Sequence, residues 1–189
     1  MAWRLSRGAL PGVAAEPWST LAGVTEEHPI LIAYDGSEPA RAAVREAGAL
    51  FAPARALVLT VWEPGLTQVM LMPDATGMGG TMLPYDPGVA RDIERASEEH
   101  ALEVAADGAR LASEVGLDAS AITAADDLTP QDAIVAAAEQ HAARAIVIGS
   151  RGLRGLKSKL LGSTSAHVLQ HAQRPVVVVR HPDDHDTHA

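Results

Sequence analysis

Five short apolar runs constrain the fold of this chain more than any other feature. They lie at residues 29–34, 56–61, 119–124, 145–148 and 175–179, and most are nearly continuous in Val, Ile, Leu and Ala. Continuous runs of this kind are typical of strands covered on both faces, as in a parallel sheet. Because segments with helical character separate them, the sequence predicts an α/β fold. We expect a single doubly wound, five-stranded parallel sheet in the order 3-2-1-4-5, with helices on both faces.

The segments between the apolar runs carry recognisable helix signals. Helices are expected at about 38–51, 89–115, 130–141 and 163–172. Ser37 or Asp35 supplies a cap for the first helix, and Thr129 followed by Pro130 is a typical helix start. The apolar spacing places four residues on the inner side of the first helix, namely Ala42, Ala43, Ala47 and Leu50.

Length and composition indicate one globular domain with a tail at each end. A domain of about 150 residues is an ordinary size for a chain of this length. We expect an N-terminal arm at 1–27, the domain at 28–181 and a polar His/Asp tail at 182–189. The arm is expected to be flexible or, alternatively, to pack its Trp3 and Trp18 rings on a neighbouring subunit.

Charge and residue types exclude several classes of function. A net charge of −9 disfavours nucleic acid and anionic membranes as partners, because both need a clustered basic face. Without cysteine the chain has no disulfide, no thiolate nucleophile and no Cys-based metal site. No apolar run approaches the roughly 20 residues of a membrane span, and we expect a cytoplasmic protein.

A glycine pattern directly after the fourth apolar run points to an anionic ligand. It reads Gly149-x2-Gly152-x9-Gly162-Ser163, and it encloses four basic residues and no acid. Those basic residues are Arg151, Arg154, Lys157 and Lys159. Glycine lets backbone N–H groups approach a ligand, and the helix that follows directs its positive end to the same place. In an acidic chain, such a loop predicts binding of a phosphate group, most simply that of a nucleotide.

The expected topology brings a second loop to the same place. Strands one and four are neighbours in the order 3-2-1-4-5, and the winding of the sheet reverses between them. The turn Asp35-Gly36-Ser37 after strand one should therefore lie beside the glycine loop after strand four. Ligands of open α/β sheets bind at such a switch point.

These motifs together resemble the universal stress protein family, and specifically its ATP-binding branch with the pattern G-x2-G-x9-G-[ST]. Three further stretches agree with the family, at residues 32–37, 132–134 and 171–176. The resemblance covers about residues 28–181 and implies an adenine-nucleotide α-hydrolase-like fold. It implies ATP as ligand, with Mg²⁺ as its counterion, and a regulatory role in the stress response.

The resemblance also assigns roles to individual residues. Asp35 corresponds to the acid that contacts the adenosine part, and Val61 to the residue whose backbone reads adenine. Ala33 and Ile148 would wall the base pocket. The implied phosphate-binding residues are Gly149, Arg151, Gly152, Gly162, Ser163, Thr164 and Ser165. Members of the family commonly dimerise through the last strand, here Val176–Val179, which implies a homodimer.

Several readings stay open at this stage. Gly149 and Gly152 could serve only to end a strand and make a turn, and Asp35 could be only a helix cap. A nucleotide-free dimeric scaffold of the same fold is the alternative function, and a nucleotide-dependent ligase or transferase is a weaker one. The chain has no G-x4-G-K-[ST] loop and no evident base beside the glycine loop, so we expect at most slow ATP hydrolysis.

Other motifs carry no assigned function. His167 and His171 have a spacing that can hold zinc, but no third ligand is evident, and we expect no metal site. The methionine-rich segment 63–88 is a lid, a partner surface or a plain loop. The sequence does not choose between ATP and AMP or a cyclic nucleotide.

Overall fold

A computed structural model of the chain describes residues 28–64, 87–126, 129–150 and 162–180. The expectations for the arm, most of the methionine-rich segment, the tail, Arg151 and Gly152 fall outside these residues. Within them, no helix is both long enough and apolar enough to cross a membrane.

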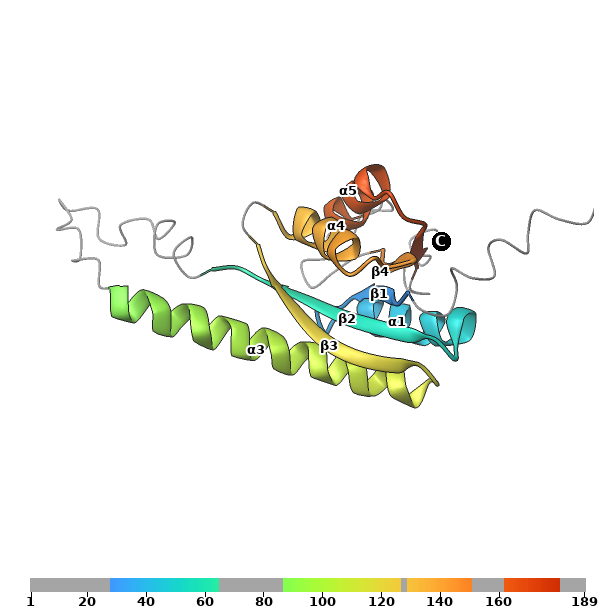
Figure 1. Ribbon diagram of the computed structural model, residues 1–189, viewed down its shortest axis with the longest axis horizontal. Coiled ribbons are helices and arrows are strands. Elements are labelled where there is room, and N and C mark those ends of the chain that lie inside the picture. The colour runs from blue at the N-terminus through green and yellow to red at the C-terminus, as the bar shows by residue number, and fades with distance from the viewer. Residues whose placement is uncertain (1–27, 65–86, 127–128, 151–161, 181–189) are drawn as a thin grey trace, which may run out of the picture.

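The described core is a five-stranded parallel sheet in the order β3-β2-β1-β4-β5, as predicted (Figure 1). The strands are β1 (Ile30–Ala33), β2 (Arg55–Trp62), β3 (Asp118–Ala125), β4 (Ala145–Gly149) and β5 (Val176–Val179). β1 pairs with both β2 and β4, so the winding reverses beside it. The sheet therefore has its switch point where the sequence predicts it.

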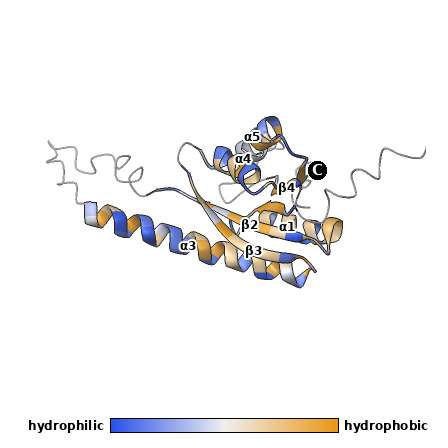
Figure 2. Ribbon diagram, viewed as in Figure 1, coloured by the Kyte–Doolittle hydropathy of each residue, from blue (hydrophilic) through white to orange (hydrophobic). Residues whose placement is uncertain are grey.

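Helices cover both faces of the sheet. They are α1 (Glu38–Phe51), α3 (Pro87–Glu114), α4 (Pro130–Gln140) and α5 (Ser163–His171). One hydrophobic cluster joins the sheet to α1 and α3, and a second joins it to α4 and α5. Figure 1 shows α3 running beyond the end of the sheet, and Figure 2 shows that this projecting part is largely hydrophilic.

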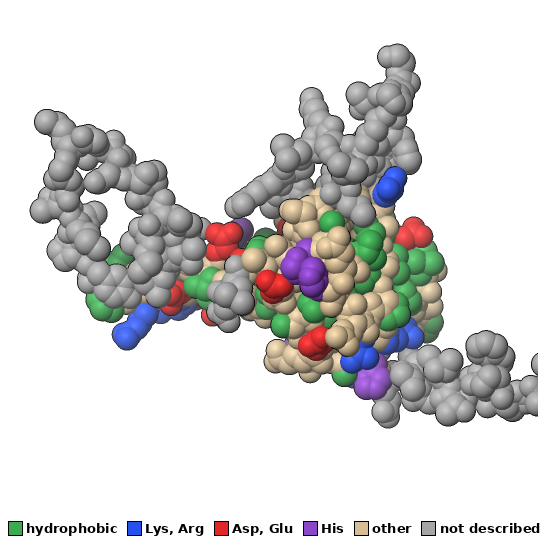
Figure 3. Space-filling view, turned by 90° about the horizontal axis from the view of Figure 1, so that it is seen from above, with side chains coloured by type: hydrophobic (Ala, Val, Ile, Leu, Met, Phe, Trp, Pro, Cys, Tyr) green, Lys and Arg blue, Asp and Glu red, His purple; other side chains and the backbone are tan. Residues whose placement is uncertain are grey.

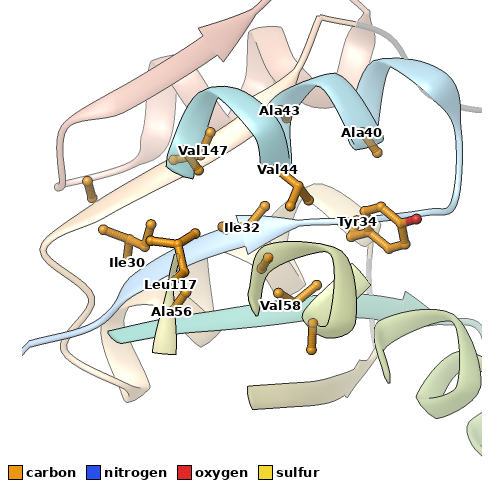
Figure 4. Close-up of a cluster of buried hydrophobic side chains, with 14 residues drawn as sticks. Ile30, Ile32, Tyr34, Ala40, Ala43, Val44, Ala56, Val58, Leu117 and Val147 are labelled. Atoms are coloured by element: carbon orange, nitrogen blue, oxygen red, sulfur yellow. The ribbon is translucent and has the colours of Figure 1, made fainter. Parts of the chain in front are cut away.

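Small residues build the core on the α1/α3 side. Ala43, Val44 and Ala47 of α1 are fully buried against the strands (Figure 4). On α3, a Cβ added to Gly108 would lie 2.7 Å from Cδ1 of Tyr34 and 2.8 Å from Cγ1 of Val58. Helix α3 can therefore approach the sheet this closely only because residue 108 has no side chain.

The prediction for the inner side of α1 was wrong at Leu50, which is 54% exposed. The buried stripe runs through Ala40, Ala43, Val44, Ala47 and Gly48. These positions recur every three or four residues, and Phe51 continues the stripe by packing against the same cluster. Leu50 is three residues after Ala47 but lies at the edge of the stripe, in the last turn of the helix. The small side chains, rather than the largest apolar one, face the sheet.

Candidate functional site

The turn between β1 and α1 is organised by its own three residues. The Asp35 carboxylate accepts a hydrogen bond from the backbone N–H of Ser37 at 3.0 Å. Gly36 adopts a φ of +78°, a left-handed conformation that favours glycine. The Ser37 hydroxyl then caps α1 by accepting from the N–H of Ala40 at 3.3 Å. Ser37, rather than Asp35, is therefore the helix cap, and the Asp35 carboxylate is held in place at the carboxyl edge of the sheet.

The end of β4 touches the start of α1, as the topology predicts. A Cβ on Gly149 would lie 2.9 Å from both the carbonyl carbon and the carbonyl oxygen of Pro39. The first glycine of the pattern is thus required by packing, because any side chain would push β4 and α1 apart. This contact brings the two predicted site loops together.

Hydrogen bonds join the two ends of the glycine loop. We call the three residues that make them, Ser150, Gly162 and Ser165, the loop neck. The carbonyl of Ser150 accepts from the N–H of Gly162 at 2.8 Å. The Ser165 hydroxyl lies 3.1 Å from the Ser150 carbonyl and 3.0 Å from the Gly162 carbonyl. Ser150 and Ser165 are 4% and 2% exposed. The loop therefore leaves and re-enters the domain at one point.

The N-terminus of α5 differs from those of α1 and α4. Ser37 and Thr129 cap α1 and α4 with their hydroxyl groups, which confirms the prediction for Thr129. At α5 the cap position is Gly162, which has no side chain to offer. Its φ of −59° is open to every residue, so the backbone conformation does not demand glycine. Ser163 is exposed and Thr164 is half-buried at this end.

The apolar residues predicted for the base pocket lie together on the α4/α5 side. Ala33 and Ile148 belong to the buried cluster on this side, and half-buried Val61 packs against it. All three lie in the last residues of β1, β4 and β2, at the carboxyl edge. The structure thus brings together nine of the predicted residues: Ala33, Asp35, Val61, Ile148, Gly149, Gly162, Ser163, Thr164 and Ser165.

A polar seam between α4 and α5 was not predicted. The Asp132 carboxylate accepts a hydrogen bond from the Thr129 hydroxyl at 2.6 Å and lies 2.9 Å from Nε2 of His167. The Thr129 bond, with a further contribution from His167, lowers the pKa of Asp132 below its ordinary value. His171 stacks on His167 with ring centroids 3.9 Å apart. Figure 3, which looks down on α4 and α5, shows histidine and acidic side chains gathered on this face.

The sequence shows the spacing of the two histidines but does not predict the contact between Asp132 of α4 and His167 of α5. The two residues are 35 positions apart in the chain, so no local pattern connects them. Within the described ranges, no three His, Cys, Asp or Glu residues form a group that could hold a metal ion. The His167 and Asp132 side chains instead form a bridge between two helices.

A cavity among the described residues lies at the opposite, amino edge of the sheet. Its volume is about 720 Å³, and its lining residues are His28, Phe51, Pro53, Ala54, Arg55, Ser113, Gly116, Leu117, Asp118 and Arg144. The C-terminal ends of α1 and α3 meet here, where helix carbonyls carry partial negative charge. The Arg144 guanidinium lies 5.5 Å from the centre of the Phe51 ring. The carboxyl edge, with its helix N-termini, is the better place for a phosphate.

Comparison with known proteins agrees with this architecture. Residues 27–180 match the Universal stress protein family. The chain belongs to that family. A universal stress protein of Thermus aquaticus is 35% identical over 153 residues, covering 80% of this chain and 97% of the relative. Universal stress protein YxiE of Bacillus subtilis is 30% identical over 152 residues, with the same coverage of both chains.

Several solved structures share the fold, and two of the three described here are universal stress proteins. The hypothetical protein MJ0577 superposes with a TM-score of 0.63 at 22% identity, covering 82% of this chain and 96% of that one. A universal stress protein in complex with cAMP gives 0.54 at 21% identity, covering 80% and 96%. The protein from Archaeoglobus fulgidus in complex with dAMP gives 0.51 at 22% identity, covering 80% and 97%.

Proposed function

We propose that this chain binds an adenine nucleotide at the carboxyl edge of its sheet, and that the nucleotide is ATP accompanied by Mg²⁺. In this proposal the protein is a regulatory module of the stress response whose conformation or partners depend on the bound nucleotide. Binding alone accomplishes this, and no catalytic step is required.

The observation that carries the proposal is the N-terminus of α5. Its first-turn N–H groups point out of the helix, and no side chain in the described part of the chain caps them, whereas α1 and α4 are both capped. Uncapped N–H groups and the helix dipole favour a negatively charged ligand. The loop neck holds this terminus at the end of β4, and Gly149 holds β4 against the β1–α1 turn.

The arrangement of the other residues fits a nucleotide with its phosphates at α5. Ser163 and Thr164 supply hydroxyl and N–H groups for phosphate oxygens, joined by Arg151 and Gly152 of the glycine loop. The base would lie over the apolar ends of three strands, against half-buried Val61 and the edge of the cluster that contains Ala33 and Ile148. Asp35 provides a carboxylate for a ribose hydroxyl or the adenine amino group.

Two of the structural neighbours support the choice of base. They are universal stress proteins in complex with cAMP and with dAMP, both of which contain adenine. Both ligands are monophosphates, so the preference of this chain for a triphosphate rests on its basic glycine loop.

Isothermal titration calorimetry with Mg-ATP, AMP, cAMP and adenosine tests the proposal. We expect ATP to bind most tightly and adenosine most weakly, because the phosphates meet the α5 terminus and the basic loop. Gly162→Val should weaken ATP binding by about tenfold or more, since a branched side chain obstructs the approach of a phosphate. Gly88→Val, at an exposed position in the first turn of α3, is the matched control. Equal affinity of wild type and Gly162→Val would contradict the site.

We further propose that the chain forms a homodimer through β5. This strand lies at the edge of the described sheet, pairs there with β4 alone, and consists of four half-buried valines. An apolar edge strand is a hazard for aggregation unless another strand or chain covers it. A second copy of the same strand is the cover that fits both the chemistry and the family resemblance.

A further inference from the structure

We propose that Ser165 positions the nucleotide-binding end of α5 by keeping the loop neck closed, and does not itself contact the phosphate. This inference rests on the proposed function and refines it, because the family resemblance implies a direct phosphate contact for this hydroxyl. A hydroxyl that closes the loop neck must point to the backbone of the neck, whereas one that contacts the phosphate must point to the ligand.

The burial and the bonds of Ser165 decide between them. Ser165 is 2% exposed, so its hydroxyl does not face solvent at the carboxyl edge. Among the residues that the structure describes, the two oxygens that accept from this hydroxyl are backbone carbonyls, those of Ser150 at 3.1 Å and Gly162 at 3.0 Å. A hydroxyl has one proton, and here that proton is directed to the neck.

The Ser150 carbonyl is the centre of the neck. It accepts from the N–H of Gly162 at 2.8 Å as well as from Ser165, so donors approach it from both the cap and the first turn of α5. Ser150 is itself fixed to the sheet, because its N–H donates to the carbonyl of Val179 at 2.7 Å. The start of α5 is thereby tied to the strand layer through a buried hydrogen-bond network.

This network also changes the role expected for the backbone N–H of Gly162. Its N–H is used by the Ser150 carbonyl, so the N–H groups left for a phosphate begin with Ser163. Loss of the Ser165 hydroxyl should loosen the bond between Gly162 and Ser150 and let the first turn of α5 shift. Nucleotide affinity then falls because the donors are no longer held in place.

The test combines amide hydrogen exchange in the nucleotide-free protein with calorimetry. In Ser165→Ala the N–H of Gly162 should exchange about threefold or more faster, and Mg-ATP should bind about three- to tenfold more weakly. Ser165→Thr keeps a hydroxyl and should restore both values. Ser163→Ala removes an exposed hydroxyl and should leave the exchange of Gly162 unchanged in the free protein. Melting curves establish that each variant is folded.

Two results would overturn the inference. Unchanged exchange of Gly162 together with weaker ATP binding in Ser165→Ala would make Ser165 a direct ligand contact. Unchanged exchange and unchanged binding would remove any role for the hydroxyl. Faster exchange in a protein whose wild type binds no nucleotide would support the neck while refuting the proposed function, so the two failures are distinguishable.

Discussion

At the scale of single residues, the structure gives different physical reasons why two positions of the same pattern, 149 and 162, are glycine. Gly149 lies against the backbone of Pro39 with no room for a Cβ, so the fold itself requires it. Gly162 has an ordinary φ and caps α5 without a side chain, so it is suited to leave helix N–H groups accessible. A single motif thus contains one glycine that packing requires and one that, in the proposed site, leaves the α5 terminus open to a ligand.

Gly149→Ala should therefore lower the free energy of unfolding by about 1–3 kcal/mol, the usual cost of overpacking. Chemical denaturation measures the change. Gly88→Ala in the first turn of α3 is the control, and it should be neutral or stabilising by less than about 1 kcal/mol because alanine favours helix. A Gly149→Ala protein as stable as wild type would mean that β4 and α1 separate without cost.

Tyr34 carries a buried hydroxyl that has no hydrogen-bond partner among the described residues. Its side chain lies beside Val58 and under α3 in the α1/α3 cluster, and the residue is 3% exposed (Figure 4). An unpartnered buried hydroxyl costs about 1–3 kcal/mol. Tyr34→Phe should keep the ring packing and leave the protein as stable as wild type or more so by about 1 kcal/mol, as measured in urea.

Burial raises the pKa of Tyr34, and this predicts a pH dependence. A tyrosine whose pKa is higher in the folded state stabilises the fold fully below its unfolded pKa of about 10 and loses that contribution as pH rises through the folded value. As the pH rises above about 10, wild type should therefore lose stability more steeply than Tyr34→Phe. Parallel curves for the two proteins would contradict the raised pKa.

At the scale of elements, the polar seam between α4 and α5 joins the two helices that cover one face of the sheet. It consists of Thr129, Asp132 and His167, with Asp132 between the other two. The side chains of Asp132 and His167 are 47% and 28% exposed, so solvent screens their attraction. The seam should make a small, pH-dependent contribution to stability.

Asp132→Asn tests that contribution. A carboxylate whose folded pKa is lowered stabilises the protein above its unfolded pKa of about 3.9, and the contribution is lost as pH falls through the folded value. The melting temperature of the variant should lie a few degrees or less below wild type at pH 6, and the gap should close at acid pH. Asp92→Asn, an exposed carboxylate beside Arg95 within α3, should show no such gap.

The elements were predictable from sequence where their signals are local. Continuous apolar runs gave the strands, and Ser37, Thr129 and Pro130 marked helix starts that the structure confirms. Contacts between distant residues could not be predicted this way, because no local pattern encodes the bridge from Asp132 to His167 or the contact of Gly149 with Pro39. Leu50 was misplaced because it lies at the edge of the buried stripe, where the spacing alone does not decide between a buried and an exposed side chain.

At the scale of the whole molecule, the described sheet ends in two different strands. β3 is eight residues long and packs along α3, whereas β5 is a four-residue strand of valine alone. We expect the valine edge to be covered by a second copy. Replacing Val177 and Val178 by threonine keeps the branched shape while removing apolar surface, and it should convert a dimer to a monomer in sedimentation equilibrium. Ile122→Thr on β3 should leave the dimer intact, and a monomeric wild type would refute the proposal.

The measurement that tests the nucleotide site most directly is an amide chemical-shift titration of the protein with Mg-ATP. The proposed site predicts that the largest shifts occur at the carboxyl edge, in Ser163 and Thr164 of α5 and around Asp35 and Val61. The amides of Ala54 and Leu117, which line the cavity at the amino edge, should stay in place. Shifts confined to the amino edge, or no shifts at millimolar ATP in nucleotide-free protein, would contradict a nucleotide site at the carboxyl edge.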